Sequence, residues 1–355
     1  MKILHSADWH LDAPLSSLDE NAAQSLRKEM KKIPEKIAEL CRQEKCELML
    51  LSGDLFDGAW SRQTLADVQQ VLAGLEIPVV ITPGNHDFCA PGSPYMEQWP
   101  ENVHIFKKAQ IESIVLPELN CRIYGGGYEA MDCPALLKRF RAEGQEKWHI
   151  GVLHAEAGNA SSTYCPITKY QVQESGLDYL ALGHIHKQGS LPAGETVCVW
   201  PGCPMGHGFD ETGEKGVMIA TLDEGVSVRF AMLDTPRFYD EDVDVSEDPV
   251  AALAGILPAV ESRDFYRVTL SGYSSGLDLQ ALKERFSHIP NLLLLDATQP
   301  EVDLWSNINE DSLEGLLFAA LKETVDGTSP EAANRALLAA RICRRILDGQ
   351  EVKLP

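Results

Sequence analysis

Five stretches of the chain share one pattern: an apolar run of strand length that stops abruptly at polar residues. Runs this apolar are typical of strands that are buried on both faces of a parallel sheet. Ligands of such sheets gather beyond the carboxyl ends of the strands, so the polar residues there form the candidate site. The stretches are KILHSAD before Trp9 and His10, ELMLLSGD ending at Asp54, IPVVITPGNHD with Asn85, His86 and Asp87, IGVLH ending at His154, and YLALGHIH with His184 and His186.

Helical patterns separate the first three of these strands. Residues 21–45 predict a helix bent at Pro34, and residues 61–75 predict another. From about residue 103 to residue 233, short strands and turns predominate, which predicts a second sheet stacked on the first. The sequence therefore predicts that residues 1–235 form one layered α/β domain.

The composition of the chain changes after Pro236. The run YDEDVDVSED, residues 239–248, holds six acidic residues and no base, which is typical of a solvated face or a linker. Alternating helix and strand patterns then predict a small α+β capping domain at residues 236–300. Two further helices with a break from Gly327 to Pro330 predict a C-terminal helical segment at residues 301–355.

Composition also limits the class of protein. With 355 residues, 44% of them hydrophobic, the chain can bury a substantial core. Its nine Cys form no CxxC pair, which favours a reduced, cytoplasmic compartment over a disulfide framework or a thiolate zinc site. We find neither a signal peptide nor a run of roughly 20 apolar residues, so we expect a soluble protein without a membrane span.

The net charge of −22 argues against a broad basic surface for nucleic acid. Such a surface binds by neutralising phosphates with Lys and Arg side chains. If the substrate is a polyanion, bound cations must therefore offset the negative charge locally.

The polar residues at the strand ends are suited to binding metal ions. They offer oxygen and imidazole donors without a thiolate, which favours divalent ions such as Mn²⁺, our first expectation, or Fe²⁺ or Zn²⁺. Seven ligands are too many for one such ion, whereas two ions that share Asp54 as a bridging carboxylate would use them all. A hydrogen-bonded structural histidine is the simpler interpretation of any one imidazole, but not of the ordered set. The predicted ligands are Asp8, His10, Asp54, Asn85, His154, His184 and His186.

The motifs DWH, GDLFD, GNHD, GVLHA and GHIH follow one another in this order, and over roughly its first 190 residues the sequence resembles the calcineurin-like metallophosphoesterases. The resemblance implies a layered α/β fold of two stacked sheets flanked by helices. It also implies two metal ions. One would be held by Asp8, His10, Asp54 and His186, and the other by Asp54, Asn85, His154 and His184.

The same resemblance implies catalytic roles for residues next to the ligands. His86 would face the scissile phosphate and stabilise or protonate the leaving oxygen. Asp57 and Asp87 would orient ligating or catalytic imidazoles, although a structural role is equally open for each. Phe56 and Asp57 stand where purple acid phosphatases of the same superfamily have a tyrosine ligand, which argues against a tyrosinate-bound ferric ion.

Within that superfamily, HSADWHLD and SGDLFDG resemble the SbcD-type DNA repair exonucleases, and WPGCPMGHGFDETGEKGV resembles their YhaO-like bacterial branch. This resemblance implies DNA as substrate and an SMC-like ATPase of the SbcC/YhaN type as partner, bound through the C-terminal helices. Apolar stripes on those helices could equally pack on the protein's own core. A homodimer is left open. The stripes are Leu313, Leu316, Leu317, Ala320 and Leu321, then Ala339, Ile342, Cys343 and Ile346.

These observations predict a metal-dependent DNA phosphodiesterase, a 3′-to-5′ exonuclease with endonuclease action left open. The enzymatic alternative is a phosphoesterase for a small molecule such as a nucleotide or cyclic nucleotide, which the acidic composition favours and the additional C-terminal domain does not. A third interpretation, a non-catalytic scaffold for an ATPase, ranks last because every ligand position is filled.

Overall fold

The computed structural model describes residues 1–159, 161–301 and 303–349. The chain forms two compact units. The first contains Met1–Glu241, Val260–Arg267 and His288–Leu293, and the second contains Asp242–Ala259, Val268–Ser287 and the chain from Leu294 onward. The units interleave along the sequence, whereas the predicted segments 1–235, 236–300 and 301–355 follow chain order. Residues 302 and 350–355 of the last segment lie outside the described part.

The first unit contains a six-stranded mixed sheet with the order β12-β11-β1-β2-β3-β4. Parallel pairs join β1 to β2, β2 to β3 and β3 to β4, while β11 pairs antiparallel with β1 and β12. Parallel neighbours need crossover connections, and helices supply two of them here. The strands are β1 (Lys2–Ser6), β2 (Leu48–Leu51), β3 (Val79–Ile81), β4 (Val103–Ile105), β11 (Gly216–Leu222) and β12 (Val226–Met232).

A second six-stranded sheet in the same unit has the order β5-β6-β7-β8-β10-β9. Its four central strands, β6, β7, β8 and β10, are parallel, and antiparallel strands form its two edges. The strands are β5 (Glu112–Leu116), β6 (Cys121–Gly126), β7 (Trp148–His154), β8 (Tyr179–Gly183), β9 (Gly189–Ala193) and β10 (Thr196–Trp200).

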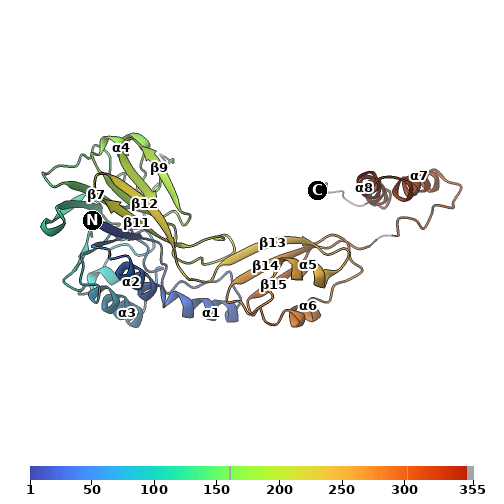
Figure 1. Ribbon diagram of the computed structural model, residues 1–355, viewed down its shortest axis with the longest axis horizontal. Helices are drawn as coiled ribbons and strands as arrows, with labels where there is room; N and C mark the ends of the chain where they lie inside the picture. Colours follow the sequence, from blue (N-terminus) through green and yellow to red (C-terminus); the bar gives the residue numbers. More distant parts are fainter. Residues whose placement is uncertain (160, 302, 350–355) are drawn as a thin grey trace. The chain divides into compact units, whose positions relative to one another are not determined.

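The two sheets pack face to face (Figure 1). Ile3, Leu48 and Leu50 of the first sheet meet Ile150 and Val152 of the second in one fully buried cluster. All four residues of β2 are buried, because its opposite face is covered by helices. This arrangement explains the uninterrupted apolar runs in the sequence and confirms the predicted fold of stacked sheets flanked by helices.

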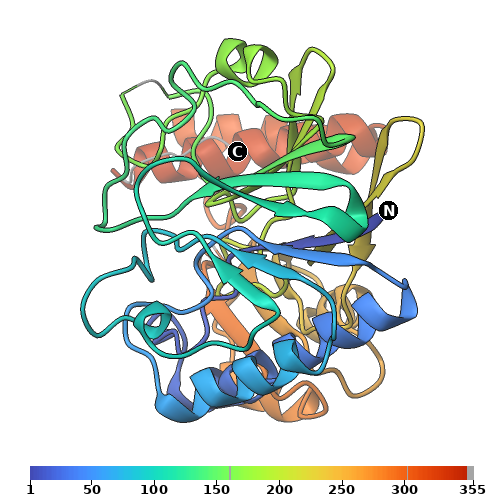
Figure 2. The same cartoon turned by 90° about the vertical axis from the view of Figure 1, so that its left-hand side faces the viewer.

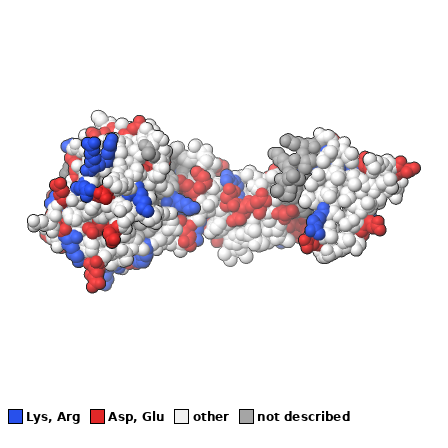
Figure 3. Space-filling view, turned by 90° about the horizontal axis from the view of Figure 1, so that it is seen from above, with Lys and Arg blue, Asp and Glu red and all other residues white. Residues whose placement is uncertain are grey.

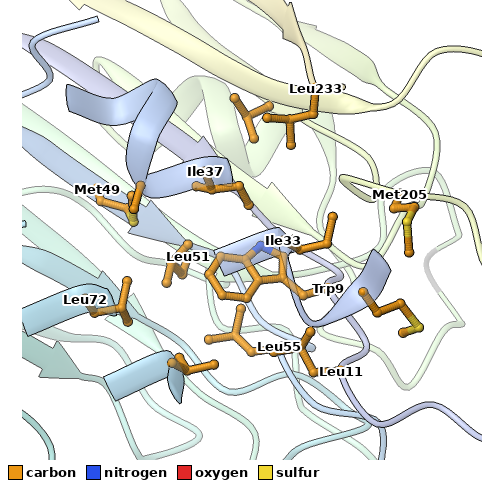
Figure 4. Close-up of a cluster of buried hydrophobic side chains, with 14 of the residues drawn as sticks. Trp9, Leu11, Ile33, Ile37, Met49, Leu51, Leu55, Leu72, Met205 and Leu233 are labelled. Carbon is orange, nitrogen blue, oxygen red and sulfur yellow. The ribbon is translucent and has the colours of Figure 1, made fainter. Parts of the chain in front are cut away.

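Helices cover the outer face of the first sheet and are drawn in blue in Figure 2. The cluster beneath them contains Trp9, Ile33 and Ile37 together with Met49 and Leu51 (Figure 4). Trp9 is 1% exposed and donates its indole N–H to Ser6 Oγ at 2.8 Å, so it is a core residue. The helices are α1 (Glu20–Met30), α2 (Ile33–Gln43) and α3 (Arg62–Ala73); α4 (Lys169–Glu174) and the short 3₁₀ helices Pro94–Met96 and Pro117–Leu119 also belong to this unit.

The region predicted as one bent helix at residues 21–45 is two helices. α1 ends at Met30 and α2 begins at Ile33, with Pro34 in its first turn, where a missing backbone N–H costs no hydrogen bond. Asp19 caps α1 by accepting from Ala22 N at 3.0 Å, and Ser61 caps α3 by accepting from Thr64 N at 3.0 Å.

A three-stranded sheet with the order β13-β14-β15 follows in the sequence. Its strands are β13 (Phe238–Asp244), β14 (Phe265–Ser271) and β15 (Leu292–Asp296), and the helices α5 (Pro249–Ile256) and α6 (Leu279–Arg285) connect them. The first half of the acidic run, predicted as a solvated face or linker, is therefore a strand and not a linker, and its acidic side chains are exposed, as a solvated face would be. Asp240 of this strand accepts from Arg267 of β14 at 2.6 Å, which offsets part of its charge.

The C-terminal helices α7 (Leu313–Gly327) and α8 (Pro330–Leu347) form a pair in the second unit. The two helices pack through Phe318 and Ala340, which are fully buried. Arg344 of α8 also donates to Glu314 of α7 at 2.5 Å. Other apolar side chains of the pair are exposed: Leu313 by 86%, Leu316 by 65%, and Ile346 by 61%. None of the helices in the described residues is long and apolar enough to cross a membrane.

Candidate active site

The seven predicted metal ligands come together where five strands of the two sheets end. Asp8 and His10 follow β1, Asp54 follows β2, and Asn85 follows β3. In the second sheet, His154 is the last residue of β7, and His184 and His186 follow β8. Side chains that are far apart in the sequence thus meet because the carboxyl ends of parallel strands share one edge.

The loops that carry these ligands adopt an unusual backbone. Asp8, His10, Asp54 and His184 have φ values of 54°, 46°, 51° and 91°, in the left-handed region. For a residue other than glycine this conformation costs about 1–2 kcal/mol. Hydrogen bonds from Asp8 N to Gly53 O and from His10 N to Asp54 O, both 3.0 Å, hold the first two loops together. Such strain is typical of functional sites.

Close backbone packing beside Asp54 requires glycine at position 84. A Cβ at Gly84 would lie 2.1 Å from Asp54 Oδ1, so any side chain there would displace the carboxylate. Gly53 has a φ of 94°, and a Cβ on it would lie 2.5 Å from His154 Nδ1. The glycines of the GD and GN motifs are therefore explained by the space that the ligands occupy.

Asp54 lies at the centre of the ligand set. Its Oδ1 accepts from His86 N at 2.9 Å, and its Oδ2 lies 3.2 Å from His154 Nε2 and 3.8 Å from His10 Nε2. Burial alone would raise the pKa of Asp54, but the neighbouring imidazoles, His154 foremost, hold it well below its usual range. Burial raises the pKa of Asp8, which accepts from His184 N at 3.0 Å.

His154 has the geometry of a metal ligand. Its Nδ1 donates to the carbonyl oxygen of Ser52 at 2.9 Å, which leaves the lone pair of the neutral imidazole on Nε2. That lone pair faces Asn85 Oδ1 at 2.9 Å and Asp54 Oδ2 at 3.2 Å. Burial lowers the pKa of His154, but Asp54 outweighs this effect and raises it to about 9. Either a proton or a metal ion must therefore occupy the space between these atoms.

His10 and His186 form a second such group. Their Nε2 atoms lie 3.0 Å apart, and His186 Nε2 is 3.9 Å from Asp8 Oδ1. His10 Nδ1 lies 3.2 Å from Asp57 Oδ1, and His186 Nδ1 is hydrogen-bonded to Glu211 Oε1. Carboxylates behind both rings favour the tautomers that turn the Nε2 lone pairs toward each other, which is the arrangement that a cation between them requires.

The donor set fits the two divalent ions that the sequence predicts. Ligand atoms of Asp8, His10 and His186 lie within 4.8 Å of one another, as do those of Asp8, Asp54 and His154. Asn85 Oδ1 lies 2.9 Å from His154 Nε2 and 3.2 Å from His184 Nδ1, so the Asn85 oxygen faces both imidazoles. Burial lowers the pKa of His184 to about 4, so it is neutral and able to bind a metal ion.

His86 lies beside this centre on the exposed side. Its side chain is 47% exposed, its Nδ1 lies 2.5 Å from Asp57 Oδ1, and its ring meets that of His10 edge-on at 4.8 Å. The hydrogen bond with Asp57 raises the pKa of His86. A ligand atom of His86 also lies within 4.8 Å of those of His10 and Asp54, so its distance alone does not distinguish a catalytic group from a ligand.

Asp57 and Asp87 occupy different environments. Asp57 lies between the imidazoles of His10 and His86, as an orienting carboxylate would. The hydrogen bonds of Asp87 go instead to the backbone N–H groups of Leu55, Phe56 and Gly84 and to the Tyr95 hydroxyl. Burial raises the pKa of Asp87 to about 6. Its contacts tie the loops after β2 and β3 together and reach no imidazole among the described residues, so an imidazole-orienting role does not fit them.

Sequence reasoning missed three groups that contact the site: the carbonyl of Ser52, His207 and Glu211. His207 donates its backbone N–H to Glu211 Oε2 at 2.8 Å, and its ring lies 5.2 Å from that of His10. Both residues lie several positions beyond the end of β10, so neither directly follows an apolar run, and the pattern that revealed the other ligands is absent. The motif GFDE marks their loop, but only the fold brings it to the site.

A cavity of about 260 Å³ opens in front of the imidazoles. Its lining includes His10, His86 and His186 together with the exposed Ser16 and Ser17.

The sequence matches a known family of proteins. Residues 1–188, more than half of the chain, match the calcineurin-like phosphoesterases. The chain belongs to that family. Calcineurin-like phosphoesterases use a dimetal centre, and the converging donors of this chain are suited to hold its metal ions.

Individual relatives extend the comparison. YhaO, an uncharacterized metallophosphoesterase of Bacillus subtilis strain 168, is 32% identical over 265 residues, which span 70% of this chain and 64% of that relative. Among solved structures, a Thermus thermophilus protein is 14% identical with a TM-score of 0.39, covering 64% of this chain and 98% of its own. A dimetal phosphatase from Danio rerio is 12% identical with a TM-score of 0.44, covering 66% and 96%.

Proposed function

We propose that this phosphoesterase is a DNA nuclease: an SbcD-like 3′-to-5′ exonuclease that processes DNA ends in repair, with endonuclease action left open. The observation that carries the phosphodiesterase chemistry is the meeting of seven oxygen and imidazole donors beside the exposed imidazole of His86. Mn²⁺ is the proposed metal, because such a donor set without thiolate suits it. Two bound ions would lower the pKa of a water and stabilise the attacking and leaving oxygens at phosphorus.

The protein residues have separable tasks in this proposal. His86 stands at the open side of the centre and donates a proton to the leaving oxygen. Asp57 supports that task in two ways: it accepts from His86 Nδ1 at 2.5 Å, which orients the ring, and it raises the pKa of His86, which keeps the proton available near neutral pH. The Asp54 carboxylate fixes the same loop by accepting from His86 N.

DNA rather than a small ester is favoured by the part of the chain beyond the catalytic family match. Residues 189–355 add a three-stranded sheet and a helical pair that hydrolysis of a small molecule does not need. The net charge of −22 opposes tight binding of a polyanion by the chain alone. In Figure 3, acidic and basic side chains are interspersed on the visible face of the first unit. Affinity for DNA would therefore come largely from a partner.

We propose an SMC-like ATPase of the SbcC/YhaN type as that partner, bound at the α7 leucines. Leu313, Leu316 and Leu317 are 86%, 65% and 40% exposed, although Phe318 of the same helix is buried against α8. The pair therefore has its own small core, and these leucines are left for another surface. The helical pair shows few charges on the face drawn in Figure 3. Tethering to a DNA-bound ATPase would raise the local concentration of substrate.

One experiment separates DNA from small esters. Purified protein with Mn²⁺ is offered labelled duplex, single-stranded and hairpin DNA, and bis-p-nitrophenyl phosphate in parallel, with and without the ATPase. We expect cleavage of DNA from its ends, stimulated by the ATPase, and loss of every activity in Asp54→Asn. Hydrolysis of the small ester, without cleavage of any DNA even when the ATPase is present, would favour a nucleotide or cyclic nucleotide phosphoesterase instead.

A further inference from the structure

Glu211 lies outside every motif that reveals the metal ligands, yet its carboxylate contacts one of them. It belongs to the loop between β10 and β11, and its side chain is 14% exposed. Its Oε1 is hydrogen-bonded to His186 Nδ1. Its Oε2 accepts from His207 N at 2.8 Å and lies 2.9 Å from His207 Nδ1 and 3.5 Å from Cys203 Sγ. A carboxylate with this many partners has a defined position.

The environment of His186 repeats that of His10 on the other side of the site. Asp57 lies behind the Nδ1 of His10 at 3.2 Å, and Glu211 lies behind the Nδ1 of His186. The Nε2 atoms of the two rings face each other at 3.0 Å. A neutral imidazole that binds a metal through Nε2 carries its proton on Nδ1, and that proton needs an acceptor.

We propose that Glu211 is a positioning residue of the metal centre: it holds the proton of His186 on Nδ1 and so keeps Nε2 directed toward Asp8. The His207 backbone and Cys203 hold Glu211 in turn. Contacts at Oε2 thus hold the carboxylate so that Oε1 faces the Nδ1 of His186.

The effect is confined to one of the two predicted metal positions. His186 belongs to the group of Asp8 and His10, whereas the tautomer of His154 in the other group is set by the carbonyl of Ser52. Loss of Glu211 therefore weakens one ion and leaves the other. This inference depends on the dimetal centre of the family and not on whether the natural substrate is DNA.

Another use of the same atoms is a third metal ion held by His186, Cys203, His207 and Glu211, whose ligand atoms also lie within 4.8 Å of one another. That ion would take the Nδ1 of His186 while Nε2 serves the dimetal centre, which requires a fully deprotonated ring. It would also need a thiolate at Cys203, where burial holds the thiol pKa well above its usual value. Positioning needs neither deprotonation.

The test is a Mn²⁺ titration of the metal-free, full-length protein, followed by equilibrium dialysis with metal analysis and by electron paramagnetic resonance of free Mn²⁺. In Glu211→Gln we expect one of the two affinities to fall by about 10–100-fold and the other to stay at the wild-type value. Glu211→Asp, which keeps the charge, should recover part of the loss. Glu214→Gln, an exposed acid three residues away, is the control and should bind both ions normally.

A second measurement excludes a general loss of structure. Saturating Mn²⁺ should restore most hydrolysis of bis-p-nitrophenyl phosphate by Glu211→Gln, with the activation midpoint shifted by the same factor as the affinity. Equal weakening of both ions, or of neither, overturns the proposal. So does a third wild-type ion that is lost in Cys203→Ser, because Glu211 would then be a ligand. If Glu211→Gln does not fold, the selective shift is read from Glu211→Asp.

Discussion

In most proteins apolar side chains are buried and polar side chains are exposed. The strand-end site and the C-terminal helical pair depart from this rule in opposite directions. At the site, Asp8, Asp54 and His154 are buried almost completely, although each is polar or charged. On the helical pair, Leu313 and Leu316 are mostly exposed, although both are apolar. Buried polar groups and exposed apolar patches are the informative departures from normal burial, whereas a buried leucine or an exposed lysine explains itself.

The two departures are stabilised differently. The buried Asp8 and His154 have hydrogen-bond partners, and the strained loops are tied together by backbone hydrogen bonds, so the protein itself holds the donors of that region in place. The α7 leucines have no comparable compensation within their own small core, which is built around Phe318. The first region is thus a set of donors that the protein itself holds in place, whereas the second is an apolar surface that stays exposed.

The strongest test of the strand-end site is Asp54→Asn. The substitution removes the central negative charge among the imidazoles, so bound metal should fall and hydrolysis of bis-p-nitrophenyl phosphate should drop by at least about 10³-fold. Metal analysis and initial rates measured on the same sample check both. Normal occupancy by two ions would show that Asp54 does not bridge them.

His86→Gln separates catalysis from metal binding within the site. If the imidazole acts on the leaving oxygen, turnover should fall by roughly 10²–10⁴-fold while both ions stay bound. Steady-state kinetics and metal content are the measurements, and Asp57→Asn, which removes the negative charge beside His86 Nδ1 but keeps an acceptor oxygen, should give a smaller loss. A missing ion in His86→Gln would mean that His86 is a ligand, as its distance from His10 and Asp54 also permits.

The helical pair is tested by Leu316→Ser combined with Leu317→Ser. If a partner buries these side chains, its affinity should fall by about 100-fold, from roughly 1.5 kcal/mol for each leucine. Hydrolysis of the small diester should not change. Binding of the ATPase is measured by calorimetry, with Glu323→Gln on the same helix as control. A large fall in melting temperature would assign the leucines to the protein's own core, and unchanged binding would place the partner elsewhere.

The smallest expected effect is the pH dependence of metal affinity. Without metal, His154 holds its proton up to a pKa of about 9, because Asp54 outweighs the effect of burial. A metal ion must displace that proton, so affinity for Mn²⁺ should rise by about tenfold per pH unit between about pH 6 and pH 8. Titration at several pH values measures this slope.

The stability of the metal-free protein should depend on pH in the opposite direction to its metal affinity. A folded-state pKa above the unfolded value means that His154 contributes stability below about pH 6.5, which is lost as the pH rises toward 9. Thermal unfolding of the metal-free protein should therefore show lower stability at high pH, where metal binds best. A metal affinity that is flat with pH would mean that His154 is already neutral.

The sequence by itself determined the strands of the parallel core and the residues at their ends. Strands that are buried on both faces appear as continuous apolar runs in the sequence. A polar residue directly after such a run lies at the carboxyl edge of the sheet. For this reason Asp8, Asp54 and His154 could be assigned to one centre without coordinates. The break between α7 and α8 was likewise visible, since Gly327 and Pro330 act locally.

Only the tertiary structure decided the contacts that depend on loops meeting. Asp57 and Asp87 have similar places in their motifs, yet one lies between two imidazoles and the other binds backbone N–H groups and Tyr95. Glu211 reaches His186 through a loop without periodicity. In α7, the packing of α8 buries Phe318, which lies outside the predicted stripe, and leaves Leu313 and Leu316 of the stripe exposed. Periodicity and strand ends are local properties of a chain, whereas the partner of a side chain is set by which distant segments the fold brings beside it.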